Sequence, residues 1–406
     1  MEGLSGRLIV GYQGWFGCPG DFEDNTLWQH WFVKGVRPEL LTVEVLPSVR
    51  GFEVADLCDT RLPRADGQGT IRLFSSQNPA VVAAHFRMMR DHGIDGAAVQ
   101  RFVSELSDPT KKRRSDRVIQ NVQAAAQATG RAFFVAYDVS GADPKTVVDA
   151  VRQDWRYLTD VLRVNASAAY LRDNGKPVLE VWGFGFSDRP APPTSDVRAL
   201  IVDLKSGRRG LAAVTLVGGV PAHWRTLSGD SRAEAVWAAI FRSYDVISPW
   251  SVGRFSDTSG ADRFVRDIVN QDISEVRRLG LRYMPVVFPG FSWSNLMRSR
   301  GRGDRAVLNE IPRGCGRFLW RQVSNLLGAH VDSLYVAMFD EADEGTAISP
   351  AVTTIGGLPK GASMVYLNQD GCALPDDWYL RVAGAAAGFL RESTIPPRSL
   401  DTVIEP

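Results

Sequence analysis

Residues 334–348 read LYVAMFDEADEGTAI, an apolar run that passes directly into an acidic segment. Asp340, Glu341, Asp343 and Glu344 fall within five consecutive positions, and a Gly-Thr pair follows them. Four carboxylates this close together repel one another, so a chain rarely keeps them beside a buried strand without a use for them. At the mouth of a barrel, such a cluster supplies a general acid and a general base, or it binds a cation.

The apolar run is the last of eight short, β-rich stretches. Continuous hydrophobic stretches of this length are typical of parallel strands that are buried on both faces. The eight runs are 8–12, 96–102, 132–138, 177–182, 213–217, 246–250, 283–288 and 334–339. Amphipathic segments of helical length accompany them: 79–92, 115–129, 144–162, 195–205, 231–242, 260–279, 311–327 and 376–391. Several of these segments begin near a capping residue, such as Ser115. The alternation predicts an α/β fold of the (β/α)₈ TIM-barrel type.

Composition and charge exclude several classes of partner. The chain has 406 residues, of which 44% are hydrophobic, and its formal net charge is +1. Nothing therefore indicates a polyanionic partner, and we interpret the basic run 111–114 as a solvated helix start rather than a nucleic-acid contact. The chain contains no run of about eighteen apolar residues, so the sequence predicts no membrane span. The first residues do not form an export signal, so we expect a cytoplasmic protein, or a secreted one whose signal is missing here.

The cysteines and the long connections bear on domain organisation. Cys18, Cys58, Cys315 and Cys372 lack the close spacing of a zinc site, and we expect neither a metal nor an organic cofactor. Cys18 and Cys58 could be bridged, which their spacing leaves open. Both lie within 17–78, a long insertion that we expect to wall one side of a cleft. We expect one domain over 1–391, followed by a Pro-rich and poorly ordered tail over 392–406.

In barrels of this type the chemistry occurs at the carboxyl ends of the strands. Those ends are rich here in aromatic, amide and carboxyl side chains and lack a Gly-rich phosphate loop, which suits a neutral polyhydroxylated ligand. For each tryptophan, stacking on a sugar competes with packing inside the barrel, and for His223 a structural role is the alternative. The predicted binding residues are Tyr12, Trp15, Gln100, Arg101, Tyr137, Asp138, Glu180, Trp182, His223, Trp250 and Trp293, with Asp340 and Asp343 in support.

With the strands placed, the chain resembles glycoside hydrolases of families 71 and 99. The segment Asp340–Thr346 is similar to the family 99 signature Asn-Glu-Trp-His-Glu-Gly-Thr, which stands at the end of the last barrel strand. Further likeness lies in GYQGWF at 11–16, FVAYDVS at 134–140 and GKPVLEVWG at 175–183. The resemblance implies a (β/α)₈ barrel and a retaining, endo-acting α-mannosidase. It also implies that Glu344 is the general acid, and that Glu341 is the base that deprotonates the sugar 2-hydroxyl.

The chain departs from that signature at two positions, and these departures keep other readings open. It has Asp340 where family 99 has Asn, and Asp343 where family 99 has His. Asp138 could instead pair with the cluster across the barrel, at the carboxylate separation of about 6.5–9.5 Å that inverting enzymes use. The expected function is hydrolysis of an α-linked polysaccharide or glycan. The alternatives are a carbohydrate-binding protein on a hydrolase-like barrel, and a hydrolase that uses the acidic cluster to hold Mg²⁺ or Ca²⁺.

Overall fold

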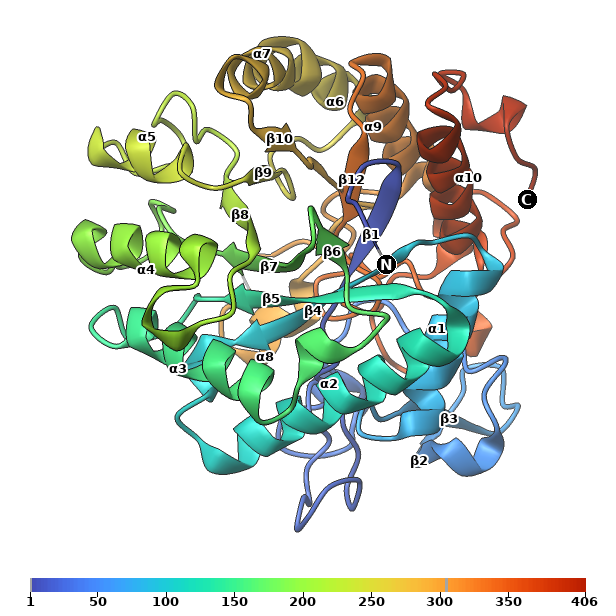
Figure 1. Ribbon diagram of the computed structural model, residues 1–406. Coiled ribbons are helices and arrows are strands. Elements are labelled where there is room, and N and C mark those ends of the chain that lie inside the picture. The colour runs from blue at the N-terminus through green and yellow to red at the C-terminus, as the bar shows by residue number, and fades with distance from the viewer. Residues whose placement is uncertain (1, 304–305) are drawn as a thin grey trace.

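The computed structural model describes residues 2–303 and 306–406, and its centre is a curled parallel sheet surrounded by helices (Figure 1). The order of its strands is β10-β9-β8-β7-β5-β4-β1-β12-β11. These strands are β1 (Arg7–Tyr12), β4 (Gly96–Phe102), β5 (Ala132–Asp138), β7 (Lys176–Trp182), β8 (Thr215–Pro221), β9 (Val246–Trp250), β10 (Arg282–Tyr283), β11 (Val286–Val287) and β12 (Ser333–Val336). A short strand, β6 (Arg172–Asp173), pairs antiparallel with β7.

The two ends of the sheet meet at the seventh strand position, which is split. Its first piece, β10, pairs with β9, and its second piece, β11, pairs with β12. At the break, the amide N–H of Met284 donates to the carbonyl of Ile247, and that of Tyr335 donates to the carbonyl of Pro285. The predicted (β/α)₈ fold is therefore confirmed, and the run predicted as 283–288 is one strand position interrupted at Pro285.

The outer helices lie where the amphipathic segments predicted them, with shifted boundaries. They are α1 (Pro79–Asp91), α2 (Pro109–Thr129), α3 (Val147–Asp160), α4 (Thr194–Ser206), α5 (Val236–Phe241), α6 (Thr258–Phe264), α7 (Asn270–Leu279), α9 (Arg317–Gly328) and α10 (Trp378–Glu392). A π-helical turn over Val265–Val269 joins α6 to α7. The start of α2 was predicted wrongly. Its cap is Asp108, whose carboxylate accepts the N–H groups of Thr110 and Lys111, so Ser115 lies inside the helix.

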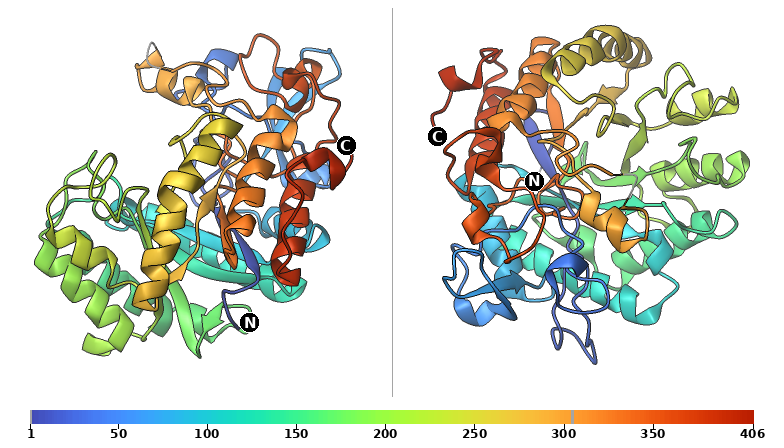
Figure 2. Two further views of the ribbon diagram at one scale, coloured as in Figure 1. Left: turned by 90° about the horizontal axis from the view of Figure 1, so that it is seen from above. Right: turned by 180° about the vertical axis from the view of Figure 1, so that it is seen from behind.

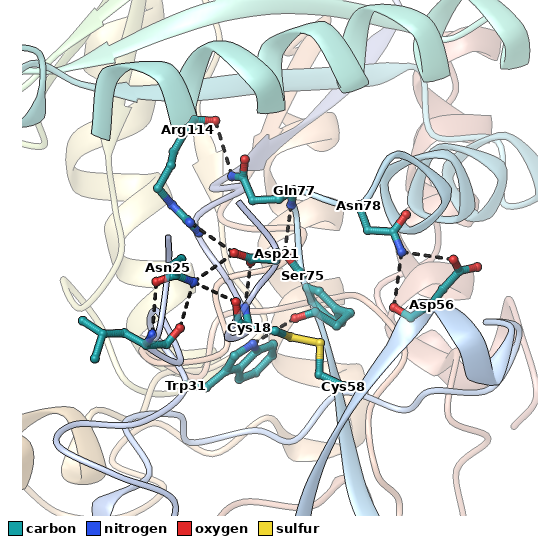
Figure 3. The surroundings of a disulfide bond; sticks show 12 residues. Cys18, Asp21, Asn25, Trp31, Asp56, Cys58, Ser75, Gln77, Asn78 and Arg114 are labelled. Atoms are coloured by element: carbon teal, nitrogen blue, oxygen red, sulfur yellow. Dashed lines mark hydrogen bonds and ion pairs between the residues drawn. A yellow bond between two sulfur atoms is a disulfide. The ribbon is translucent and has the colours of Figure 1, made fainter. Parts of the chain in front are cut away.

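The insertion over 17–78 forms a second, smaller core beside the barrel. It contains the antiparallel pair β2 (Leu57–Pro63) and β3 (Thr70–Phe74). Trp31 is fully buried there, and its indole N–H donates to the carbonyl of Phe74 at 2.9 Å. Cys18 and Cys58 are bonded to each other, which ties the chain after β1 to β2 (Figure 3). The bridge that the spacing left open is thus present in the structure.

The tail over 392–406 packs on the barrel, contrary to the expectation of poor order. The indole N–H of Trp320 on α9 donates to the carbonyl of Pro397 at 2.9 Å. Leu400 is 1% exposed, and Arg398 pairs with Asp262. Buried apolar surface and paired polar groups therefore hold this segment. Over the described ranges, no helix is long and apolar enough to cross a membrane.

Arg101 and Tyr137, which we predicted to bind substrate, instead lie in a buried network outside the sheet. The guanidinium of Arg101 pairs in a bidentate manner with Asp154 on α3, with both contacts at 2.6 Å. It also pairs with Asp116 on α2 at 2.8 Å. The hydroxyl of Tyr137 donates to Asp154 at 2.7 Å. These two predictions are wrong because both side chains leave the strands on the helix-facing side, where they join the sheet to α2 and α3.

We expect Asp154→Ala to lower the free energy of unfolding by about 3–5 kcal/mol, because it leaves the Arg101 charge buried without its main partner. Chemical denaturation followed by circular dichroism measures this. The control is Asp149→Ala on the same helix, because the Asp149 side chain is 72% exposed in its pair with Arg152. That variant should change stability by less than about 1 kcal/mol. Equal effects of the two substitutions would show that the buried network does not anchor α3.

Candidate active site

A cavity of about 680 Å³ opens at the carboxyl ends of the strands. Cavities of roughly 300–1,000 Å³ are the size that ligand sites usually have. Nine of the predicted residues line it: Trp15, Gln100, Asp138, Glu180, Trp182, Trp250, Trp293, Glu341 and Glu344. The barrel therefore gathers side chains from strands and loops that are far apart in the sequence, and both proposed catalytic glutamates are among them.

The loop after β12 is fastened to the end of β1 by Asp340. One oxygen of its carboxylate accepts the backbone N–H of Gln13 at 2.7 Å, and the other accepts that of Gly14 at 2.9 Å. Burial raises the pKa of Asp340 to about 7, although these two hydrogen bonds act in the opposite direction. Asp340 is 2% exposed and does not line the cavity. It is a positioning residue for the loop, and its predicted contact with substrate is not supported.

Glu341 is held at both of its carboxyl oxygens. The side-chain amide of Gln13 donates to Oε1 at 2.5 Å, and the hydroxyl of Thr346 donates to Oε2 at 2.6 Å. Glu341 is 6% exposed, and burial together with the neighbouring charge of Glu344 raises its pKa well above the usual range for glutamate. The orientation of this carboxyl group is therefore set by residues on β1 and on its own loop.

Glu344 has a more open setting. Its side chain is half-buried, and no hydrogen bond from the described residues reaches its carboxyl oxygens. Burial and the charge of Asp343 raise its pKa to about 7, while Arg300 acts in the opposite direction. A pKa of about 7 lets Glu344 hold a proton near neutral pH, and a general acid requires this.

Asp343, the second departure from the family 99 signature, lies behind the cavity wall. It is 3% exposed, and its Oδ1 is buried with no hydrogen-bond partner. Its Oδ2 lies 3.5 Å from Nδ1 of His30, and the ring of His30 stacks on Trp15 with centroids 4.2 Å apart. Asp343 therefore acts on the site through charge and through the support of Trp15, and its predicted contact with substrate is not supported.

Asp138 and Glu180 form a second acidic pair, on the neighbouring strands β5 and β7. The register places Ala136 beside Glu180 and Asp138 beside Trp182, so Glu180 lies one step deeper in the barrel. Burial raises the pKa of Asp138. Burial and the charge of Asp138 raise the pKa of Glu180 to about 8. Besides Asp188 and Glu310, the cavity is thus lined by two carboxyl groups from the acidic loop and two from the strands β5 and β7.

Aromatic rings form much of the remaining wall. Trp182 lies edge to face with Trp250, with centroids 5.3 Å apart, and it also contacts Phe186 at 4.9 Å. Phe291 and Trp293 lie 5.4 Å apart in the loop before α8 (Ser294–Ser299). The indole nitrogens of Trp15, Trp182 and Trp293 are buried and have no hydrogen-bond partner among the residues that the structure describes. Indole faces with free N–H donors suit a ligand that has apolar faces and hydroxyl groups.

That the insertion walls the cleft stays a prediction: its Gln29 and His30 line a smaller pocket that shares Gln13 and Trp15 with this cavity, but no described residue of 17–78 lines the cavity itself. The insertion supports the two loops that do, at the same end of the sheet (Figure 2). His30 holds Trp15 by stacking. The buried carboxylate of Glu44 accepts the hydroxyl of Ser292 at 2.6 Å and the backbone N–H of Asn295, and these residues flank Trp293. The insertion therefore acts one layer behind the site.

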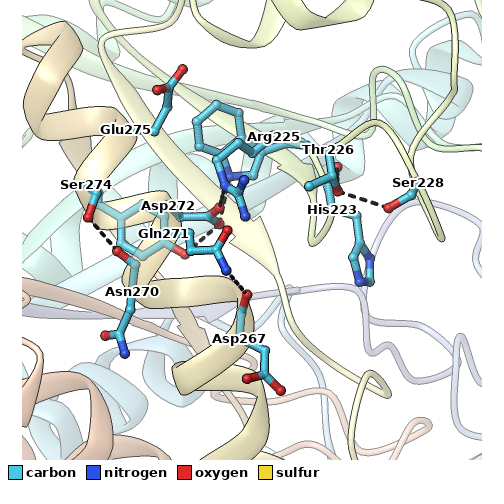
Figure 4. Close-up of polar contacts among 12 residues, drawn as sticks. His223, Arg225, Thr226, Ser228, Asp267, Asn270, Gln271, Asp272, Ser274 and Glu275 are labelled. Carbon is cyan, nitrogen blue, oxygen red and sulfur yellow. Dashed lines mark hydrogen bonds and ion pairs between the residues drawn. The ribbon is translucent and has the colours of Figure 1, made fainter.

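Tyr12 and His223 do not reach the cavity either. Tyr12 is fully buried, and its hydroxyl shares a hydrogen bond of 2.9 Å with Nδ1 of His85. His223 has the structural role that we left as its alternative, since its Nδ1 lies 2.9 Å from Asp230. Figure 4 shows His223 turned away from the nearby buried contacts of Arg225 with Asp272 on α7. These contacts fasten the loop after β8 to the outer helices.

The structure adds residues that our list of binding residues omitted. Gln13 lines the cavity and orients Glu341, and it lies within the stretch GYQGWF that we quoted for its resemblance. The hydroxyl of Tyr335 on β12 accepts the side-chain amide of Gln100 at 2.9 Å. Arg189 and Arg300 also line the cavity. The alternation of side chains along a strand identifies Tyr335, whereas the two arginines lie in loops whose paths the sequence does not indicate.

Comparison with solved structures places this architecture in the class of barrels that glycoside hydrolases share. Two structures of the family 99 endo-α-mannosidase from Bacteroides thetaiotaomicron are similar, each with a TM-score of 0.65 over 96% of this chain. One shows 16% identity over 98% of its own length, and the other 15% over 99%. Identities this low show a shared fold alone. A family 5 protein from Streptomyces cattleya follows, with a TM-score of 0.44, which is too low to support an argument.

Comparisons by sequence identify no relative: no family model matches this chain, and no curated protein matches it. Within the ranges that the structure describes, no group of three or more His, Cys, Asp or Glu side chains is arranged to hold a metal ion.

Glu180→Gln should stabilise the protein increasingly as the pH rises from about 5 to about 9. The pKa of Glu180 is raised on folding to about 8, so at low pH both the folded and the unfolded state hold its proton. Above the ordinary glutamate pKa the unfolded chain ionises first, and the wild type loses stability that the variant keeps. Urea denaturation across this range measures the difference, with Glu310→Gln at the cavity mouth as the control for charge removal. A constant difference between Glu180→Gln and wild type would contradict the buried setting of Glu180.

Proposed function

We propose that this protein is a glycoside hydrolase that cleaves an α-linked polysaccharide or glycan, with Glu344 as general acid and Glu341 as general base. The observation that carries the proposal is the placement of Glu341 and Glu344 together in one cavity at the carboxyl ends of the barrel strands. The shared fold supports hydrolysis in general. The α-linkage rests on the resemblance and on the endo-α-mannosidase whose fold is similar.

The surroundings of the two glutamates support different roles for them. Glu344 faces the cavity without a hydrogen-bond donor from the described residues, so its proton is free to reach a glycosidic oxygen. The donors Gln13 and Thr346 hold both oxygens of Glu341, which sets its direction and opposes part of the rise in its pKa that burial and Glu344 cause. A carboxylate oriented in this way can remove a proton from a sugar hydroxyl or from water. The tryptophans on the wall supply flat faces for the sugar rings.

The first experiment measures product release from a panel of α-mannans and α-glucans by wild type, Glu344→Gln and Glu341→Gln. We expect each substitution to lower kcat/KM by about 10²–10⁴-fold, the usual contribution of a general acid or base. Glu310→Gln, at the same cavity, should retain activity. Proton NMR identifies the anomer that is released first, and this anomer distinguishes retention from inversion. Saturable binding of a glycan with no product would replace the proposal with that of a carbohydrate-binding protein.

A second experiment separates the two roles by the quality of the leaving group. An aryl α-glycoside with an acidic phenol needs little protonation as it departs, so Glu344→Gln should cleave it far better than it cleaves the polysaccharide. Glu341→Gln should lose activity on both substrates, because its task precedes departure of the leaving group. If Glu341→Gln were the variant that the aryl substrate rescued, the two roles would be exchanged.

The pH profile tests the same assignment without a mutation. The pKa of Glu344 is about 7, so wild-type activity on a polysaccharide should fall as the pH rises through that value and the acid loses its proton. The fall should be weaker with the aryl glycoside. Steady-state kinetics on the two substrates across neutral pH provides the measurement. The same decline on both substrates would remove Glu344 from the role of acid.

A further inference from the structure

The cavity contains more carboxyl groups than the proposed reaction uses. Glu341 and Glu344 account for an acid and a base, but Asp138 and Glu180 also line the same cavity. Among the described residues, no Lys, Arg or His nitrogen lies within the 4.0 Å of an ion pair with either of them. Arg189 acts on Asp138 only at longer range, and its own guanidinium pairs with Asp188 at 2.8 Å. Buried carboxyl groups without a positive partner are costly, so this pair calls for an explanation.

The free atoms of the pair are hydrogen-bond acceptors when the pair is ionised. Oε2 of Glu180 is buried and has no hydrogen-bond partner in the described part of the chain, and Glu180 itself is 3% exposed. Oδ1 of Asp138 accepts the backbone N–H of Ser140 at 2.7 Å, which sets the direction of that carboxyl group. Because β5 and β7 are adjacent and parallel, the two side chains project into the barrel from neighbouring strands. They therefore present oxygens toward one point on its floor.

Aromatic rings and other carboxyl groups surround that point. Trp182 lies beside Asp138 in the strand register, and Trp250 and Phe186 pack against it. The electron-rich faces of such rings attract cations, and the guanidinium carbon of Arg189 lies 5.0 Å from the ring centroid of Trp182 and 4.8 Å from that of Phe186. From β12 the hydroxyl of Tyr335 faces the same space, and from the acidic loop Glu341 and Glu344 do so. Of the other arginines that line the cavity, Arg254 pairs with Asp230 and Arg300 faces Glu344. The floor is thus acidic and aromatic, and among the described residues the arginine nearest to it, Arg189, forms its ion pair with Asp188 rather than with Asp138 or Glu180.

We propose that Asp138 and Glu180 bind the protonated amine of an amino sugar, so that the substrate is a glycan with non-acetylated amino-sugar residues. This inference rests on the proposed function, because it names the substrate class of the same cavity. An ammonium group has three donors and no acceptor, which matches a pair of carboxylates that receive only Ser140 as a donor from the described residues. A hydroxyl group brings one donor and two lone pairs, and it leaves the negative charge of the pair uncompensated.

Binding of the amine releases a proton from Glu180 to the buffer. In mildly acidic solution the empty site holds a proton on Glu180, whose pKa is about 8 beside Asp138. The ammonium group brings one positive charge, Glu180 ionises to pair with it, and the displaced proton passes to the buffer. No covalent bond forms or breaks. A neutral sugar at the same place leaves the proton on Glu180, so the release of a proton distinguishes the two modes of binding.

The experiment is calorimetry with matched methyl α-glycosides of glucose and mannose that carry an amine or a hydroxyl at C2, C3 or C6. It uses the Glu341→Gln/Glu344→Gln double variant, in mildly acidic buffers of different ionisation enthalpy. We expect at least one amino glycoside to bind about tenfold more tightly than its hydroxyl counterpart, which corresponds to about 1.4 kcal/mol. The dependence on buffer should show the release of about one proton. Equal affinity across every matched pair would overturn the proposal.

Three single substitutions added to that double variant locate the amine. Glu180→Gln and Asp138→Asn should each abolish the preference for the amine while binding of the hydroxyl glycoside persists, which also shows that the variants are folded. Glu310→Gln at the mouth should leave the preference unchanged. If wild type preferred the amine but the double variant did not, the amine would belong to the catalytic pair and the inference would be wrong. Failure of the proposed hydrolysis would appear separately, as absence of product from any glycan with the amine preference intact.

Discussion

The site depends on the attachment of the loop after β12 to the end of β1. Asp340 accepts the backbone N–H groups of Gln13 and Gly14, and the side chain of Gln13 in turn donates to Glu341. These contacts join residues more than 300 positions apart in the chain. They form because β1 and β12 are neighbours in the sheet, with Val10 beside Val336. A buried carboxylate with two amide donors is a rigid connection, and it determines where the acidic loop points.

This connection also explains how four carboxylates can occupy five consecutive positions. Asp340 and Asp343 turn into the protein, where Asp340 meets backbone amides and Asp343 lies near His30. Glu341 and Glu344 turn toward the cavity. The two extra acids therefore raise the local negative potential without occupying the space of a substrate. Part of the cost of burying Asp340 and Glu344 is met by holding protons, as their raised pKa values indicate.

A second layer of structure stands behind the cavity wall. The insertion builds its own small core and uses His30 and Glu44 to hold the loops that carry Trp15 and Trp293. The disulfide between Cys18 and Cys58 cross-links two segments of this layer. Positioning by a supporting layer is the usual requirement for a site whose side chains must keep their direction in the absence of ligand. The long connection after β1 is thus explained by support rather than by contact with the cavity.

Much of the fold and part of the site could be read from the sequence, because the signals for them are local. Apolar runs alternating with amphipathic segments predicted the barrel, and the acidic segment after its last strand predicted where carboxylates gather. Side-chain alternation along a strand also separates Asp138, which faces the cavity, from its neighbour Tyr137, which faces the helices. We listed both of them, and likewise both Gln100 and Arg101, because a strand end alone does not show which residue still belongs to the sheet.

The tertiary structure decided which of these side chains meet. Arg101 lies outside the cavity because it forms ion pairs with Asp154 on α3 and Asp116 on α2. No local sequence pattern links these three positions. Gln13 is part of the site because the ends of β1 and β12 are adjacent. The sequence by itself determined the barrel and the acidic end of its last strand, since periodicity and composition act over short stretches. Only the folded chain determined the partners of each buried charge, because those partners come from distant segments that packing alone brings together.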